Sequence, residues 1–218
     1  MALTVLQEDR HILVCVKPAG VLSEEGGLPE LLRAQCGGEV RCVHRLDRGV
    51  GGVMVYARTR EAAAALSRSV AERRLVKEYL AVAEGRSAFS DDELRDLLYH
   101  DAAKNKSYVV ARPRRGVREA VLRCRTLDVK ETDGTALSLL SLLLETGRSH
   151  QIRVQLASRS LPLVGDGRYG ARTRGEIALW ARTLSFPHPA TGETLSFSAL
   201  PPESFPWTLF SENLKQGG

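Results

Sequence analysis

Residues 107–144 read SYVVARPRRGVREAVLRCRTLDVKETDGTALSLLSLLL, and this stretch decides the fold class. It contains three apolar segments of strand length, which are Ser107–Ala111, Ala120–Val129 and Leu137–Leu144. The third segment is the most apolar, and we expect it to be a central strand. Three strands that follow one another without a clear helix between them favour an α+β fold over a doubly wound α/β fold.

The rest of the chain extends this pattern in both directions. Upstream, we expect strands at Ile12–Val16, Val53–Ala57 and Tyr79–Ala83, a helix at Leu28–Cys36, and a second helix that Thr59 caps and that runs to Arg73. Downstream, we expect Ser149 to cap a helix through Ser158, followed by strands at Ile177–Phe186 and Thr194–Ser198. The sequence therefore predicts a mixed, mainly antiparallel central sheet with flanking helices and loops.

The composition is that of a globular protein, since 43% of the 218 residues are hydrophobic and 26% are charged. This length can bury a sizeable core, and we predict a single domain over residues 1–218. No apolar run reaches the roughly 18 residues that a membrane-spanning helix needs. Residues 1–10 lack the basic start and the apolar stretch of a signal peptide. We therefore expect a cytoplasmic protein without a membrane partner.

The cysteines and histidines do not form a recognisable metal site. The four cysteines are Cys15, Cys36, Cys42 and Cys124; they contain no C-x-x-C pair, and no histidine pair has helical ligand spacing. Four cysteines in a chain of this length are also too few for a disulfide framework. We expect buried thiols in a reducing compartment and no metal.

The positive charge is concentrated in one segment. The chain has 31 basic and 26 acidic side chains, so its net charge is +5. The segment from Lys104 to Arg118 contains no acidic residue and six basic ones, so it accounts for +6 and the remaining residues for −1. The six are Lys104, Lys106, Arg112, Arg114, Arg115 and Arg118. This concentration favours an arm that contacts the phosphate groups of a polyanion over a merely solvated loop.

Two motifs that carry chemistry in other proteins are weak here. Residues 165–170 read GDGRYG and match G-x-G-x-x-G, but Pro162 interrupts the run before them and no amphipathic helix follows. We therefore interpret them as a turn and not as a dinucleotide loop. Cys42 and His44 share a face of a strand, as a cysteine hydrolase would need, but a packed cysteine beside a structural histidine explains them better.

Asp47 is the strongest candidate for a catalytic group. A lone aspartate on a glycine-rich turn is usually an Asx-turn or a cap, but residues 146–153, TGRSHQIR, supply arginines at positions 148 and 153. A carboxylate that must stay ionised in an apolar cleft needs a cation beside it, and arginine does not lose its charge.

With these residues the chain resembles the RluA-type RNA pseudouridine synthases. The matching pieces occur in order: VKPAG at 16–20, HRLD at 44–47, KEYLA at 77–81, TGRSHQIR at 146–153, PLVGDGRYG at 162–170 and FPHPATGE at 186–193. The resemblance extends from about Ile12 to Pro202. It implies an isomerase that breaks the N-glycosidic bond of a uridine, turns the uracil and reattaches it through carbon, without a cofactor. The uridine has to be flipped out of the RNA first.

The resemblance also implies roles for individual side chains. Asp47 is the nucleophile that attacks the sugar or the base, or that supports a glycal intermediate. Arg148 pairs with Asp47 and keeps it ionised. Tyr79 stacks on the uracil, and its hydroxyl takes or relays a proton. Without the neighbouring motifs, Tyr79 would be interpreted as a core aromatic residue.

Further residues contact the substrate or brace the site. Arg45 fills the gap that the flipped base leaves, or contacts phosphate, and Ile152 packs against the floor of the pocket. His150 and Gln151 are expected to be structural. Asp47 lies too early in the chain for an N-terminal S4-type module to precede it, so the basic segment 104–118 is expected to choose the RNA. That RNA is a tRNA or an rRNA, and we expect the protein to be a monomer.

One departure from the family pattern leaves a second function open. Residues 50–52 are Val-Gly-Gly where the family usually has Thr-Ser-Gly, so two hydroxyl groups are missing. This change is compatible with a non-catalytic RNA-binding protein on the same scaffold, although the intact Asp47, Tyr79 and Arg148 oppose that interpretation. A small-molecule hydrolase with Asp47 as its nucleophile would leave the basic surplus unexplained.

Overall fold

The computed structural model describes residues 2–132 and 134–216. These residues cluster into two compact units. The first unit contains residues up to Glu78 together with Trp180–Pro201, and the second contains Tyr79–Leu179 together with residues from Pro202 onward.

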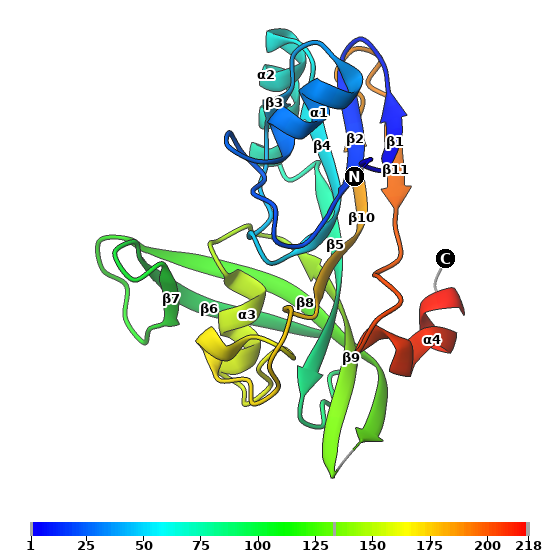
Figure 1. Ribbon diagram of the computed structural model, residues 1–218. Coiled ribbons are helices and arrows are strands. Elements are labelled where there is room, and N and C mark those ends of the chain that lie inside the picture. Colours follow the sequence, from blue (N-terminus) through cyan, green and yellow to red (C-terminus); the bar gives the residue numbers. More distant parts are fainter. Residues whose placement is uncertain (1, 133, 217–218) are drawn as a thin grey trace. The chain divides into compact units, whose positions relative to one another are not determined.

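The first unit is built on antiparallel strands with one parallel pairing. It contains β1 (Val5–Glu8), β2 (Ile12–Lys17), β3 (Arg41–Cys42), β4 (Gly51–Ala57), β10 (Leu179–Pro187, whose first residue belongs to the second unit) and β11 (Thr194–Ser198). Strand β4 pairs with β2 and β3 in the antiparallel sense and with β10 in the parallel sense, and β10 pairs with β11. Helix α1 spans Leu28–Cys36 and helix α2 spans Arg60–Ala71 (Figure 1).

Alternate residues of these strands form the core of the first unit. Ile12 and Val14 of β2 are fully buried, as is Val55 of β4, and they cluster with Leu66 of α2. Helix α2 begins where the sequence predicts, because the Thr59 hydroxyl accepts a hydrogen bond from the backbone N–H of Ala62 at 3.1 Å. The apolar alternation on the strands and the cap on the helix together place α2 on this sheet face.

The second unit contains the stretch that decides the fold. Its strands are β5 (Val76–Glu84, which begins in the first unit), β6 (Asp92–Asp101), β7 (Lys106–Val109), β8 (Val117–Thr132) and β9 (Thr135–Leu144). Their order is β5-β9-β8-β6-β7, and the pairs β9–β8, β8–β6 and β6–β7 are antiparallel (Figure 1). The predicted α+β fold with a mixed, mainly antiparallel sheet is therefore confirmed.

Three local expectations need correction or completion. The sequence predicted no element over 92–101, where the structure has β6 with an irregular burial pattern. Helix α3 spans Gln151–Ala157, and its N-cap is His150 in the left-handed conformation with φ 55°, so Ser149 is not the cap. The carbonyl of Ser149 instead accepts a hydrogen bond from the Ser107 hydroxyl. The C-terminal tail contains η2 (Trp207–Phe210) and α4 (Ser211–Gln216).

The GDGRYG segment is a turn, as predicted. Residues Gly167–Tyr169 form a single 3-10 turn, η1, and Gly170 follows in the left-handed conformation with φ 97°. Val164 next to it is hydrogen-bonded to Val82, and the described residues 171–178, which follow Gly170 directly, contain no helix. The geometry that a dinucleotide loop requires, a strand leading directly into a helix, is not formed here.

Candidate active site

The turn that carries Asp47 is held from three sides within the first unit. The backbone N–H of Val50 donates to the carbonyl of Asp47 at 3.0 Å and closes the turn. The Ser23 hydroxyl donates to the Leu46 carbonyl at 2.8 Å and accepts from the Leu46 N–H at 3.1 Å. The Tyr56 hydroxyl in turn donates to the Ser23 carbonyl at 2.8 Å. These bonds fix the backbone immediately before Asp47, whose own side chain is half-buried.

A buried lysine, Lys17, joins this turn to the turn that follows it in the VKPAG motif at 16–20. The Lys17 side chain is fully buried, and its ammonium group donates to the carbonyls of Val21 at 2.6 Å, Pro18 at 3.0 Å and Arg48 at 3.2 Å. Burial lowers the pKa of Lys17 to about 8, and the negative charge of Asp47 opposes this shift. Lys17 therefore provides both a structural tie and a positive charge close to Asp47.

Gly51, which stands where the family usually has serine, and Gly52, which matches the family's glycine, both lie against strand β10. Trp180 of β10 is paired with Gly51, and Ala181 with Gly52. A Cβ atom on Gly51 would be 2.4 Å from Cζ3 of Trp180, and Gly52 has φ 123° with the Ala181 backbone 2.3 Å from the position of its Cβ. Glycine at both positions is therefore a packing requirement of this chain.

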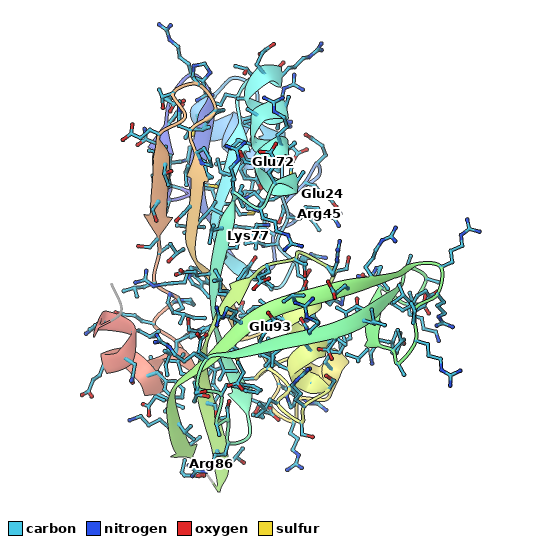
Figure 2. The ribbon with its side chains drawn as sticks, turned by 180° about the vertical axis from the view of Figure 1, so that it is seen from behind. Glu24, Arg45, Glu72, Lys77, Arg86 and Glu93 are labelled. Atoms are coloured by element: carbon cyan, nitrogen blue, oxygen red, sulfur yellow. The ribbon has the colours of Figure 1, made fainter. Side chains whose placement is uncertain are left out.

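Arg45 has a partner on the surface of the first unit. It forms an ion pair with Glu24 at 3.1 Å, and both side chains are more than half exposed (Figure 2). An exposed pair of this kind contributes little to stability, so the Arg45 guanidinium can exchange Glu24 for a phosphate at small cost.

Tyr79 and Ile152 are buried in the second unit. Tyr79 of β5 has 5% of its surface exposed, and Ile152 in the first turn of α3 has 4% exposed. This burial is compatible with an aromatic platform and with a packing residue respectively.

Arg148 lies in the turn before α3. Its Nε donates to the carbonyl of Glu119 at 2.9 Å, and its backbone N–H donates to Oε1 of Gln151 at 3.0 Å. The Thr146 hydroxyl also donates to Oε1 of Gln151, at 2.8 Å, while Nε2 of Gln151 donates to the Val121 carbonyl at 3.1 Å. Gln151 thus braces the turn, in agreement with the structural role expected for it.

The structure adds a buried ion pair that the sequence did not assign. Arg153 and Asp166 are 7% and 1% exposed, and Nε of Arg153 is 2.7 Å from Oδ2 of Asp166. A second bond at 2.9 Å joins Nη2 of Arg153 to Oδ1 of Asp166. The charge-assisted, bidentate geometry stabilises two charges that would otherwise be costly to bury. In the sequence, the only indication of this pair is that each residue lies in a motif of the resembled family, Arg153 in TGRSHQIR and Asp166 in PLVGDGRYG.

The basic segment 104–118 comprises β7, the following loop and the start of β8. Lys104, Arg112, Arg114, Arg115 and Arg118 are exposed, while Lys106 is partly buried. The Arg114 guanidinium lies 4.8 Å from the centre of the Tyr99 ring, and Lys104 is 4.0 Å from Asp101. In the described part of the chain, no ion pair is recorded for Arg112 or Arg115. We call this set of six basic side chains the basic arm.

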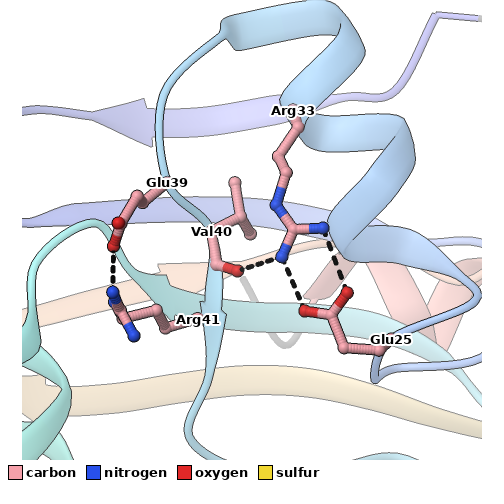
Figure 3. A pocket seen from close by; sticks show the side chains of 5 residues that line it. All are labelled: Glu25, Arg33, Glu39, Val40 and Arg41. Atoms are coloured by element: carbon pink, nitrogen blue, oxygen red, sulfur yellow. Dashed lines mark hydrogen bonds and ion pairs between the residues drawn. The ribbon is translucent and has the colours of Figure 1, made fainter.

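In another candidate site, a pocket of the first unit, the charged side chains already pair with one another. A pocket of the first unit is lined by two ion pairs, Arg33–Glu25 at 2.6 Å and Arg41–Glu39, so its cations are neutralised (Figure 3). Over residues 2–132 and 134–216, no cluster of His, Cys, Asp and Glu is placed to hold a metal ion.

The Cys42–His44 pair does not have the contacts of a cysteine hydrolase. The Cys42 thiol donates to the backbone carbonyl of His44 at 3.0 Å, while Nε2 of His44 accepts from the Val55 N–H at 3.3 Å. Burial raises the pKa of the Cys42 thiol, which disfavours the reactive thiolate. The arrangement agrees with a packed cysteine beside a structural histidine.

None of the described helices is long and apolar enough to cross a membrane.

Comparisons with known proteins identify relatives that match most of this chain. The family model for RNA pseudouridylate synthase matches residues 11–158. An uncharacterised RNA pseudouridine synthase of Bacillus subtilis, YhcT, is 35% identical over 208 residues, which are 88% of this chain and 67% of that protein. The ribosomal large subunit pseudouridine synthase D of Xanthomonas campestris is 36% identical over 228 residues, covering 92% of this chain and 66% of that protein. The chain thus spans about two thirds of the length of these relatives.

The solved structures support the fold. The human RNA pseudouridylate synthase domain containing 1 protein superimposes with a TM-score of 0.80 at 24% identity, and the match covers 94% of this chain and 86% of that one.

Proposed function

The chain belongs to the RNA pseudouridylate synthase family, whose members are isomerases, and on that basis we propose that it converts uridine in RNA to pseudouridine. The bond between C1′ and N1 breaks, the uracil turns, and a bond between C1′ and C5 forms. A proton leaves C5 and N1 gains one, so atoms and charges balance without a cofactor. The target base has to leave the RNA stack, at a cost of a few kcal/mol.

The observation that carries this proposal is the fixed turn at Asp47. The Ser23 hydroxyl and the Lys17 ammonium group hold the backbone on both sides of this aspartate. A nucleophile benefits from such support because little has to reorganise when the substrate arrives. The positive charge of Lys17 also lies close to the Asp47 carboxylate, which is the nucleophile in this proposal.

The remaining catalytic roles follow the family motifs. Tyr79 stacks on the uracil, and its hydroxyl takes or relays the proton that leaves C5. Arg148 supplies a cation that balances the charge of Asp47. Arg45 contacts phosphate or fills the gap left by the flipped base, and Ile152 forms part of the pocket floor.

The basic arm supplies affinity for RNA. Its residues Lys104, Lys106, Arg112, Arg114 and Arg115 contact the phosphate backbone of a tRNA or an rRNA. One relative is named for the ribosomal large subunit, which makes an rRNA the first substrate to test. We further propose that residues 1–218 act as one catalytic domain, as a monomer and in the cytoplasm.

Release of tritium from RNA that carries 5-tritiated uridine tests the activity directly, because isomerisation liberates the hydrogen on C5. Transcripts of ribosomal RNA and of tRNA should release tritium with the native protein. The Asp47→Asn variant keeps the shape of the side chain and removes its charge, so it should fold and bind RNA normally without releasing tritium.

The same assay separates the alternatives. RNA binding by the native protein without tritium release from any transcript would favour a non-catalytic RNA-binding protein. Turnover by Asp47→Asn at the native rate would refute the assignment of the nucleophile. Arg148→Met should slow turnover and move the acid limb of the activity–pH profile upward, and an unmoved limb would assign the balancing charge to another residue.

A further inference from the structure

The segment 166–169 connects three separate elements of the second unit. Its first residue, Asp166, is bound to Arg153 of α3 through the buried bidentate ion pair. Arg168 reaches the turn between β6 and β7, where its Nη1 donates to the carbonyls of Lys104 at 2.9 Å and Asn105 at 3.1 Å. This is the turn at which the basic arm begins.

Tyr169 makes the central connection. Its hydroxyl oxygen accepts a hydrogen bond from the backbone N–H of Ser107 at 2.8 Å and is 3.0 Å from Nδ1 of His150. Ser107 lies in β7, one residue after Lys106, whereas His150 caps α3 two residues after Arg148. One hydroxyl group therefore joins the base of the basic arm to the turn that carries Arg148.

Ser107 forms a parallel link between the same two elements. Its hydroxyl donates to the Ser149 carbonyl at 2.6 Å and is 3.1 Å from Nδ1 of His100. Because the Ser107 hydroxyl proton is used on Ser149, the oxygen has to accept from His100, whose Nδ1 then carries the proton. Ser107 is 1% exposed, so these bonds are protected from competition by water.

The Tyr169 ring interacts separately with two cations. Nζ of Lys106 is 5.3 Å from the ring centre, and the guanidinium carbon of Arg153 is 5.1 Å from it. The ring also packs against the cluster of Leu98, Ala120 and Val154. These contacts depend on the ring and not on the hydroxyl group, so removing the hydroxyl alone separates the two functions.

We propose that Tyr169 is a positioning residue for RNA capture, which fixes the basic arm relative to the turn before α3. The inference rests on the proposed function, because it assigns RNA binding to the arm. Without the hydroxyl, the arm keeps all of its charges but loses the hydrogen bond from the Ser107 N–H to Tyr169, so that the Ser107 hydroxyl remains as its tie to the turn before α3. Part of the binding free energy is then spent on ordering the arm.

The test is Tyr169→Phe, measured first by filter binding to in vitro transcripts of ribosomal RNA. Two hydrogen bonds of ordinary strength are lost, so the Kd should rise about tenfold. The slope of log Kd against log salt should be unchanged, since no phosphate contact is removed. In the tritium-release assay, KM should rise in proportion while kcat stays within about twofold. Ser107→Ala should change Kd in the same direction, and the double variant should be less affected than the sum of the single changes.

Tyr99→Phe is the matched control. Tyr99 is on the neighbouring strand β6, it carries Arg114 over its ring, and no hydrogen bond of its hydroxyl is recorded in the described residues. Its Kd should equal that of the native protein. An unchanged Kd for Tyr169→Phe, a loss of kcat without a change of affinity, or an equal loss in Tyr99→Phe would overturn the proposal.

Should Tyr169→Phe fail to fold, Ser107→Ala tests the same link, because it retains the N–H bond to Tyr169 and loses only the bridge to Ser149 and His100. An unchanged Kd for Ser107→Ala would then overturn the proposal. If the native protein releases no tritium, the proposed function fails, while the comparison of binding constants still decides the role of Tyr169.

Discussion

Neutralising the basic arm should change the salt dependence of RNA binding in a calculable way. The perturbation is the simultaneous replacement of Arg112, Arg114 and Arg115 by alanine. All three side chains are exposed, and the Arg114 guanidinium lies over the Tyr99 ring. Because no carboxylate partner is recorded for them in the described residues, they need not give up an ion pair to bind a phosphate.

The magnitude follows from counterion release. Each phosphate that is neutralised on a single strand contributes a slope of about −0.7 in log affinity against log salt. Three lost contacts should therefore flatten the slope by about 2. Between roughly 50 and 200 mM salt, which is a fourfold change, the native protein should lose about 16-fold more affinity than the triple variant. Turnover at saturating RNA should persist, because the arm captures the substrate and is separate from the Asp47 turn.

The assay is filter binding of both proteins across a salt series. A matched control replaces Arg86, Arg95 and Arg123 by alanine, which lowers the net charge by the same amount. Each of these arginines already pairs with a carboxylate, and the three pairs are Arg86–Glu131, Arg95–Glu93 and Arg123–Asp91. The control should keep the native slope. If plots of log affinity against log salt have the same slope for the native protein and the arm variant, the reasoning is refuted. The search for RNA contacts would then turn to Arg168, Arg172 and Arg174.

Three further predictions concern the candidate site. Tyr79→Phe should fold and bind RNA normally but lose most tritium release, since only the hydroxyl is removed; early melting with normal turnover would make Tyr79 a core residue. Gly51→Ala should lower the free energy of unfolding in urea by about 1–3 kcal/mol, because its Cβ meets Trp180, and Trp180→Phe should recover part of the loss. The pKa of Lys17 is about 8 in the folded chain and 10.5 in the unfolded chain, so the unfolded state binds more protons between these pH values. The contribution of Lys17 to the free energy of unfolding should therefore rise with pH in this range, by at most about 3 kcal/mol. Lys17→Met should lose this contribution, so that the free energy of unfolding in urea rises less with pH than in the native protein when it is measured at pH 8, 9 and 10; an equal pH dependence in both proteins would contradict the assignment.

Local signals in the sequence were sufficient for much of the fold. The hydroxyl of Thr59 caps α2 because capping involves groups only three residues apart. The apolar run at 137–144 becomes part of β9, and the motifs around Asp47 identify the family. Strand β6 was missed because its side chains do not alternate regularly between apolar and polar, and only pairing with β7 and β8 defines it.

Other properties depend on residues far apart in the chain. The packing of Gly51 could not be read from the sequence, because the neighbour of this glycine is the ring of Trp180, more than a hundred residues later, on the paired strand. Lysine side chains are mostly exposed in folded proteins, yet the carbonyls of Arg48, Val21 and Pro18 hold the Lys17 side chain in the interior. Serine often caps helices, which is why Ser149 was expected to cap α3. In the structure the Ser149 carbonyl accepts a hydrogen bond from the Ser107 hydroxyl, and His150, in the left-handed conformation, is the N-cap.

The sequence by itself determined the family, the fold class and the residue types that carry the chemistry, because these depend on motifs and periodicities a few residues long. The tertiary structure decided which charges are buried, which glycines are obligatory and that Tyr169 ties β7 to the start of α3. Those features depend on which distant groups desolvate one another, and burial, unlike backbone propensity, is a property of the folded chain alone.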